Sequence, residues 1–220
     1  MFKEVVATPI DKSRRGLICG VGINDAWYKV SGLSAEGKKI NCPYYSRWKD
    51  MVVRCYSERE LARYPTYIGC SVSSEWLLFS NFRKWMETQD WKGKHLDKDI
   101  LVEGNKIYSP TTCVFVTSAV NALFTDHGAA RGECPLGVSW HKDTRKYIAS
   151  CNNGEGKMKH LGLYESTDSA EAAYCAYKSV LVRKVASTTT GALQSALLRK
   201  SSTLESKGNK LEEAKEAERL

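Results

Sequence analysis

Basic side chains are the most concentrated chemical feature of this sequence, and they gather in residues 131–162. This stretch holds six basic residues against three acidic ones, whereas residues 163–186 hold three of each. Lys and Arg clustered on one small surface are typical of proteins that bind the phosphates of a nucleic acid. The alternative is an ordinary solvated surface, because charged side chains are normally exposed. The six basic residues are Arg131, Lys142, Arg145, Lys146, Lys157 and Lys159.

The eight cysteines are the other residues with reactive potential. No two of them have the spacing of two to four residues that a structural zinc site uses. Several lie in apolar runs, such as Cys113 within the sequence Thr-Cys-Val-Phe-Val at 112–116. A free cysteine packs as a small hydrophobic residue. We therefore expect reduced, mostly buried cysteines that neither bind metal nor act as nucleophiles.

The composition of the 220 residues sets the class of protein. Hydrophobic residues make up 42% and charged residues 26%, which is enough apolar material for one large or two small domains. The net charge of +8 and the pI of about 9.0 favour a polyanionic partner. The mean hydropathy is −0.41, no apolar run has the length of a membrane span, and the first residues lack the apolar core of a secretory signal. We expect a soluble intracellular protein.

The basic stretch must be positioned by strands and turns. Residues 136–140, 147–151 and 159–164 have the character of strands, and the turns between them carry hairpin chemistry of the Asn-Gly kind. A helix is predicted over 166–186, which would cover one face of the sheet and leave the other face free. A small free sheet can enter the major groove of DNA, which is about 12 Å wide. The apolar stripe of this helix would comprise Ala170, Ala173, Tyr174, Tyr177, Val180 and Leu181.

Two aromatic helices are predicted earlier in the chain. The first is expected to end before Pro65, and the second to begin near Ser74 with Ser73 or Ser74 as its N-cap. A strand at 94–100, a turn-rich loop at 103–110, a strand at 113–117 and a short helix from Ser118 follow. The apolar positions of the two helices are Tyr44, Trp48, Met51, Val52 and Cys55, then Trp76, Phe79, Phe82 and Met86.

Breaks in composition divide the chain into four parts. Residues 1–43 show no sustained period and are predicted to be an irregular N-terminal segment. Clusters of Gly at 127–132 and of Ser and Thr at 187–191 indicate loops. We therefore expect domains at 44–127 and 133–186. A C-terminal tail at 187–220 would be partly helical or disordered, because a short isolated helix is marginal in water.

The second domain resembles the Apetala-two/ethylene-response-factor DNA-binding domain over about 50 residues. The resemblance is carried by the residues of 137–140, 146–149, 159–164 and 170–174, which keep the order and spacing of that family. It implies a three-stranded sheet that contacts DNA and packs on one helix. By position, the residues on or beside the DNA face would be Ser139, Trp140, Lys142, Arg145, Lys146, Tyr147, Ser150, Lys157 and Lys159.

The first domain resembles the phage HNH endonucleases, the ββα-metal nuclease family, over about 90 residues. The motifs that carry the resemblance begin at Tyr45 and Cys70, continue with the residues of 96–99 and 108–113, and end at Asn121. The family implies a divalent cation that stabilises charge on the scissile phosphate, and a general base that activates water.

Carried over by position, Asp97 and Asn121 would be the metal ligands. This chain has Lys98 where the family has its histidine, and Thr112 where the family has its central asparagine. His95, two residues before Asp97 on the same strand face, is then the candidate base. Without the resemblance, Asp97 and Asn121 are simply helix-capping or solvated polar residues. The expected catalytic residues are His95, Asp97, Lys98 and Asn121, with Lys98 and Lys106 contacting phosphate.

These expectations define an α+β protein with a degenerate ββα-metal (HNH-like) domain and a three-stranded antiparallel sheet packed on one helix. The predicted function is that of a metal-dependent DNA endonuclease of the phage HNH or homing type, a hydrolase that docks on double-stranded DNA and uses Mg²⁺ or Mn²⁺. It would act in the bacterial host cytoplasm near the nucleoid, with neither a membrane nor a small-molecule substrate.

Two alternatives stay open. One is a catalytically inactive HNH-like DNA-binding protein that regulates or inhibits host machinery. The other is an interaction protein that recruits a protein partner through the tail at 187–220.

Overall fold

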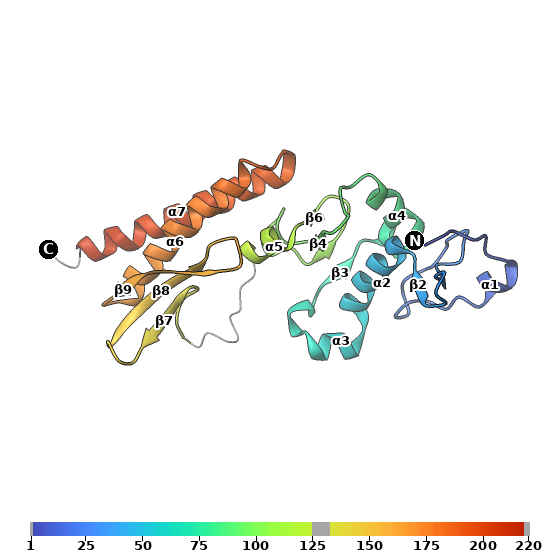
Figure 1. Ribbon diagram of the computed structural model, residues 1–220, viewed down its shortest axis with the longest axis horizontal. Coiled ribbons are helices and arrows are strands. Elements are labelled where there is room, and N and C mark those ends of the chain that lie inside the picture. Colours follow the sequence, from blue (N-terminus) through green and yellow to red (C-terminus); the bar gives the residue numbers. More distant parts are fainter. Residues whose placement is uncertain (1, 125–132, 218–220) are drawn as a thin grey trace. The chain divides into compact units, whose positions relative to one another are not determined.

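The computed structural model describes residues 2–124 and 133–217, so the predicted break at 127–132 lies outside the described residues. The chain forms two compact units, of which one ends at Phe115 and the other begins at Val116 (Figure 1). The fold is mixed α+β, as predicted, and includes a three-stranded antiparallel sheet. In the part of the chain that is described, no helix is both long enough and apolar enough to cross a membrane.

The first predicted helix of unit 1 is confirmed. Helix α2 spans Pro43–Tyr56 and begins with proline at its first position, where the missing N–H is not needed. Its apolar stripe is buried, with Trp48 and Val52 fully inaccessible. Two short elements follow it, α3 (Glu58–Arg63) and the 3₁₀ turn η1 (Pro65–Tyr67).

The second predicted helix is divided in two. A 3₁₀ turn, η2, spans Ser74–Leu77, and α4 spans Phe79–Glu87, with Leu78 extended between them. The cause is the backbone of Ile23, which donates its N–H to the carbonyl of Leu77 at 2.8 Å and accepts the N–H of Phe79 at 3.0 Å. Leu78 is therefore the N-cap residue of α4, and neither predicted serine caps a helix with its side chain.

The prediction of an irregular segment at 1–43 is wrong, because this segment contains helix α1 (Pro9–Ser13) and strands β1 (Ser31–Leu33) and β2 (Lys39–Asn41), paired antiparallel. Tyr28 is 1% exposed and belongs to the core of unit 1. The guanidinium of Arg15 donates hydrogen bonds to the carbonyls of Asn24, Ala26 and Tyr28. Contacts of this kind fix a loop without any periodic pattern in its sequence.

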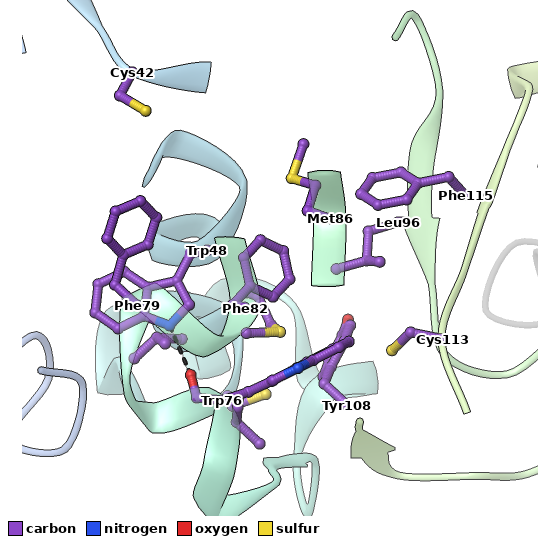
Figure 2. Close-up of a cluster of buried hydrophobic side chains, with 14 of the residues drawn as sticks. Cys42, Trp48, Trp76, Phe79, Phe82, Met86, Leu96, Tyr108, Cys113 and Phe115 are labelled. Atoms are coloured by element: carbon purple, nitrogen blue, oxygen red, sulfur yellow. Dashed lines mark hydrogen bonds between the residues drawn. The ribbon is translucent and has the colours of Figure 1, made fainter. Parts of the chain in front are cut away.

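The core of unit 1 is built from large aromatic side chains. Figure 2 shows Trp48 and Phe79 against each other, with ring centroids 5.5 Å apart, and the indole N–H of Trp48 donating to the carbonyl of Trp76 at 2.7 Å. Tilted and edge-on aromatic pairs of this kind add about 0.5–1.5 kcal/mol each beyond the area they bury.

Two short strand pairs complete unit 1, and one of their strands carries His95 and Asp97. Strands β3 (Ser71–Val72) and β5 (Ile107–Tyr108) pair in parallel. Strand β4 (His95–Asp97) pairs with β6 (Val114–Val116), and helix α5 (Ser118–Phe124) follows β6 in sequence.

The sheet and helix predicted in unit 2 are confirmed. Strands β7 (Val138–His141), β8 (Lys146–Asn152) and β9 (Met158–Tyr164) form an antiparallel sheet in the order β7-β8-β9. Helix α6 spans Thr167–Ala186, and the hydroxyl of its N-cap Ser166 accepts the N–H of Ser169. The helix packs on one face of the sheet, where Ala170 meets Val138 and Ala149.

The C-terminal tail, expected to be partly helical or disordered, is largely helical over its described residues. Residues Gly191–Ala217 form one helix, α7, which packs along α6 (Figure 1). Leu197 is fully buried, and the hydroxyl of Ser201 donates to the carbonyl of Ser179 at 3.0 Å. Tertiary packing supplies the stability that an isolated helix lacks.

Helix α7 also changes which face of α6 is buried. Because α6 lies between the sheet and α7, it buries residues around much of its circumference, as a helix enclosed on several sides does. The predicted single stripe is therefore wrong at Val180, which is 64% exposed. Helix α5 joins the same unit, since Leu123 packs with Val182 and Leu197.

Candidate functional site

The register of the unit 2 sheet decides which side chains share a face. Val138 lies opposite Ala149, and both are buried against Ala170 of α6. Residues directly opposite each other on neighbouring strands point to the same side. Trp140 and Tyr147, the next such pair along the strands, therefore belong to the covered side, with ring centroids 4.9 Å apart.

No helix of the described residues packs on the other face of the sheet, which carries polar side chains beside the apolar Ile148 and Leu163. On it Ser139 lies opposite Ile148, and His141 lies opposite Lys146. A β-bulge between Ala149 and Ser150 shifts the register by one residue. Strand β9 adds further residues to this face. One of them, His160, lies opposite Ser150 and is exposed. We call this surface the free face.

The turns at the two ends of the sheet add exposed cations. Lys142 and Arg145 lie in the turn between β7 and β8, and Lys157 lies before β9; all three are exposed. Arg145 has a φ of 49°, the left-handed conformation that this tight turn requires. Lys146 forms an ion pair with Glu165 at 2.7 Å, which reduces the positive charge beside the turn.

The register divides the residues predicted to lie on or beside the DNA face. Ser139, Lys146 and Ser150 are on the free face, next to the turn residues Lys142, Arg145 and Lys157. Trp140, Tyr147 and Lys159 are on the covered side. Lys159 places its ammonium over the ring of Tyr177 of α6, 4.8 Å from the ring centroid.

Sequence reasoning missed the two histidines of the free face. His141 follows Ser139 at an interval of two, so strict alternation along β7 could have identified it. His160 could not be assigned in this way, because the β-bulge changes the alternation at a point that only strand pairing reveals.

Asp97 ends strand β4 and holds the turn that follows. Its Oδ1 accepts the backbone N–H of Asp99 at 2.7 Å and that of Ile100 at 2.8 Å. Burial raises the pKa of this carboxyl above its ordinary value, and the two N–H donors offset part of that rise. The carboxylate therefore caps the turn after β4. This capping role is the one that the sequence left open as an alternative to metal binding.

Lys98 is an enclosed cation. Its side chain is 7% exposed, and its Nζ lies 2.6 and 2.7 Å from the two carboxylate oxygens of Asp99. The ammonium also lies 5.7 Å from the ring centroid of Tyr108. Burial alone would lower the pKa of Lys98, but the hydrogen bonds and charge of Asp99 outweigh it and raise the pKa. Lys98 is thus protonated, and its ammonium is already bound by Asp99. It suits neither a general base nor a free phosphate contact.

The remaining residues predicted for the nuclease site are His95, Lys106 and Asn121. His95 is exposed on β4, two residues before Asp97. Lys106 donates from its ammonium to the carbonyl of Thr66 at 3.3 Å. Asn121 lies on α5 and belongs to unit 2, whereas His95, Asp97 and Lys98 belong to unit 1.

Within residues 2–124 and 133–217, no group of three or more His, Cys, Asp or Glu side chains is placed to hold a metal ion. All eight cysteines are free, and six are buried, as expected for core residues. Burial raises the pKa of the Cys55 and Cys113 thiols to about 12, so both stay protonated. Among the described residues, no such group of metal ligands surrounds Asp97, the ligand that the resemblance implies in unit 1.

Comparison with known proteins identifies no match to this chain. Neither a family model, nor a curated protein, nor a solved structure matches this chain.

Proposed function

We propose that this protein binds duplex DNA through the free face of the β7-β8-β9 sheet and the two turns beside it. The observation that carries the proposal is the division of the sheet into a face covered by α6 and an uncovered face rimmed by exposed cations. Lys142, Arg145 and Lys157 would contact phosphates, and the strands would lie in the major groove. The overall charge of +8 favours the same polyanionic partner.

In this proposal unit 1 serves as a scaffold without nuclease activity, acting as part of a regulator or inhibitor of host machinery. Two features support this choice over catalysis. Lys98 is paired with Asp99 where a general base is needed, and Asp97 already accepts two backbone hydrogen bonds. Asp97 has no companion group of His, Cys, Asp or Glu for a metal among the described residues of unit 1, so this proposal includes no metal-dependent step.

The binding test uses the full chain and a labelled duplex of mixed sequence, with affinity measured by fluorescence anisotropy over a series of salt concentrations. The test variant is Lys142→Gln combined with Arg145→Gln, and the control is Lys184→Gln combined with Lys210→Gln on helices α6 and α7. Both variants remove the same charge. Each lost phosphate contact should reduce the slope of log affinity against log salt by about 0.9, so the test variant should lose about 2.

Two results would contradict this proposal. Equal effects of the two double variants would mean that net charge rather than the sheet determines binding. No duplex binding by the wild-type chain, even at low salt, would refute the DNA partner altogether.

A metal-dependent endonuclease is the second candidate function. Strand β4, the long loop, strand β6 and helix α5 follow one another in the order expected for such an enzyme, and Asp97 retains Oδ2 for a cation. Supercoiled plasmid incubated with Mg²⁺ or Mn²⁺ tests it, with EDTA and Asp97→Ala as controls. Nicking that requires metal and is lost in Asp97→Ala would establish the endonuclease and overturn the inactive scaffold. Intact plasmid with retained binding supports the proposal above.

A further inference from the structure

His141 occupies the position on the free face where β7 ends and the turn to β8 begins. It lies opposite Lys146, and it is partly exposed. Its side chain shares the face with Ser139, whereas Trp140 between them points to the covered side. A contact from His141 would therefore reach whatever binds this face.

The proton position of the His141 ring follows from its neighbours. The backbone N–H of Thr144 donates to Nδ1 at 3.3 Å, and the hydroxyl of Thr144 lies 2.9 Å from the same nitrogen. A backbone amide can only donate, so Nδ1 must present its lone pair. The neutral ring then carries its proton on Nε2, which becomes a hydrogen-bond donor.

The Nε2–H of this ring is a directional donor that lies beside charged side chains. Lys146, the residue opposite, is neutralised by Glu165 at 2.7 Å, and Lys142 and Arg145 lie in the adjoining turn. These flexible cations suit phosphates, which are bound by charge. A ring held in place by its own turn suits a base edge, which is recognised by the direction of a donor.

We propose that His141 is a specificity-determining residue that donates from Nε2 to the O6/N7 edge of a guanine in the major groove. Guanine presents two adjacent acceptors there, whereas adenine pairs its N7 acceptor with an amino donor that would oppose the histidine. This inference rests on the proposed DNA-binding function.

The test compares two substitutions of the same residue in the full chain. In His141→Gln the terminal amide carries a donor near the position of Nε2, whereas in His141→Asn the shorter amide can occupy only the position of Nδ1. Binding sites are selected from a random duplex pool, and affinities are then measured for the selected site and for the same site with adenine or 7-deazaguanine at the critical position. Thermal unfolding of both variants checks that the sheet still folds.

We expect the wild-type chain to prefer guanine over adenine at one position by about fivefold to tenfold, because Nε2–H donates a single hydrogen bond. His141→Gln keeps a donor near Nε2, but its amide also carries an acceptor that suits adenine, so this variant should bind the guanine site better than His141→Asn while losing part of the preference. His141→Asn should lose this preference while keeping the salt dependence of binding. The inference is overturned if His141→Asn retains the preference, or if it weakens binding equally on all sequences, which would indicate a phosphate contact. Absence of any duplex binding by the wild type refutes the proposed function and this inference together.

A measurement without DNA tests the first step separately. Nitrogen-15 NMR of the histidine side chains should assign a protonated Nε2 and an unprotonated Nδ1 to His141 in the neutral ring. The opposite assignment would overturn the inference even if the protein binds DNA.

Discussion

Gly137, immediately before β7, is the residue whose substitution should damage unit 2 most directly. Its φ is +80°, a conformation that costs an L-residue about 1–2 kcal/mol. A Cβ placed on it would lie 2.5 Å from Cε2 and 2.7 Å from Cγ of Tyr174, and closer still to Cδ2. Tyr174 is 5% exposed and packs with Cys151 and Cys175, so its ring has little room to move.

Gly137→Ala should therefore lower the free energy of unfolding of unit 2 by about 2–5 kcal/mol. The backbone contributes about 1–2 kcal/mol, and overpacking of a filled core typically adds about 1–3 kcal/mol. Because domains are stable by only about 5–15 kcal/mol, a loss of this size is a large fraction of the total. Urea denaturation followed by Trp140 fluorescence measures it, since Trp140 is the tryptophan of unit 2.

Gly156→Ala is the matched control in the same unit. Its φ is +82°, but a Cβ on Gly156 would meet no atom within 4 Å, so only the backbone strain of about 1–2 kcal/mol applies. Hydrogen exchange of peptides from β7 and α6 should confirm where Gly137→Ala acts. Equal loss of stability in the two variants would refute the argument that the ring of Tyr174 leaves no space beside Gly137.

Leu197→Ala should lower the free energy of unfolding by about 2–5 kcal/mol, because its side chain is fully buried, whereas Leu198→Ala, with 44% exposure, should have a much smaller effect in the same urea titration. Equal effects would argue against the docking of α7. Asp99→Asn should destabilise unit 1 by about 1–2 kcal/mol, since it leaves the ammonium of Lys98 buried without its carboxylate, which is itself half exposed. Because Asp99 raises the pKa of Lys98 above 10.5, the ion pair stabilises unit 1 fully below pH 10.5, and this stabilisation is lost as the pH rises through the raised pKa. The Asp99→Asn variant should not show this loss of stability at alkaline pH. Cys19, which is exposed, should react fastest with a thiol reagent in the native chain, and rapid modification of the buried cysteines would contradict the described core.

Local pattern determined much of this protein. The apolar spacing of Trp48, Met51, Val52 and Cys55 was sufficient to predict α2, because a helix buries one stripe at intervals of three and four. The hairpins of unit 2 followed from turn chemistry, and α6 followed from the helical spacing of apolar residues such as Ala170 and Tyr174. These features depend on residues close together in sequence, and the sequence displays such interactions directly.

Contacts between distant residues decided the rest. The backbone of Ile23 interrupts the second aromatic helix at Leu78. The sequence pattern of that helix does not indicate a hydrogen-bond partner more than fifty residues away. Helix α7 is ordered because Leu197 is buried, which depends on the face that α6 offers.

The candidate site divides in the same way. The sequence alone located the basic residues of the β7-β8-β9 sheet and its turns, because their type and spacing are local properties. Strand register then placed Trp140 and Lys159 on the covered side and His141 on the free face, and burial beside Asp99 made Lys98 a structural cation. Register and burial are set by packing against other elements, so they belong to the tertiary structure.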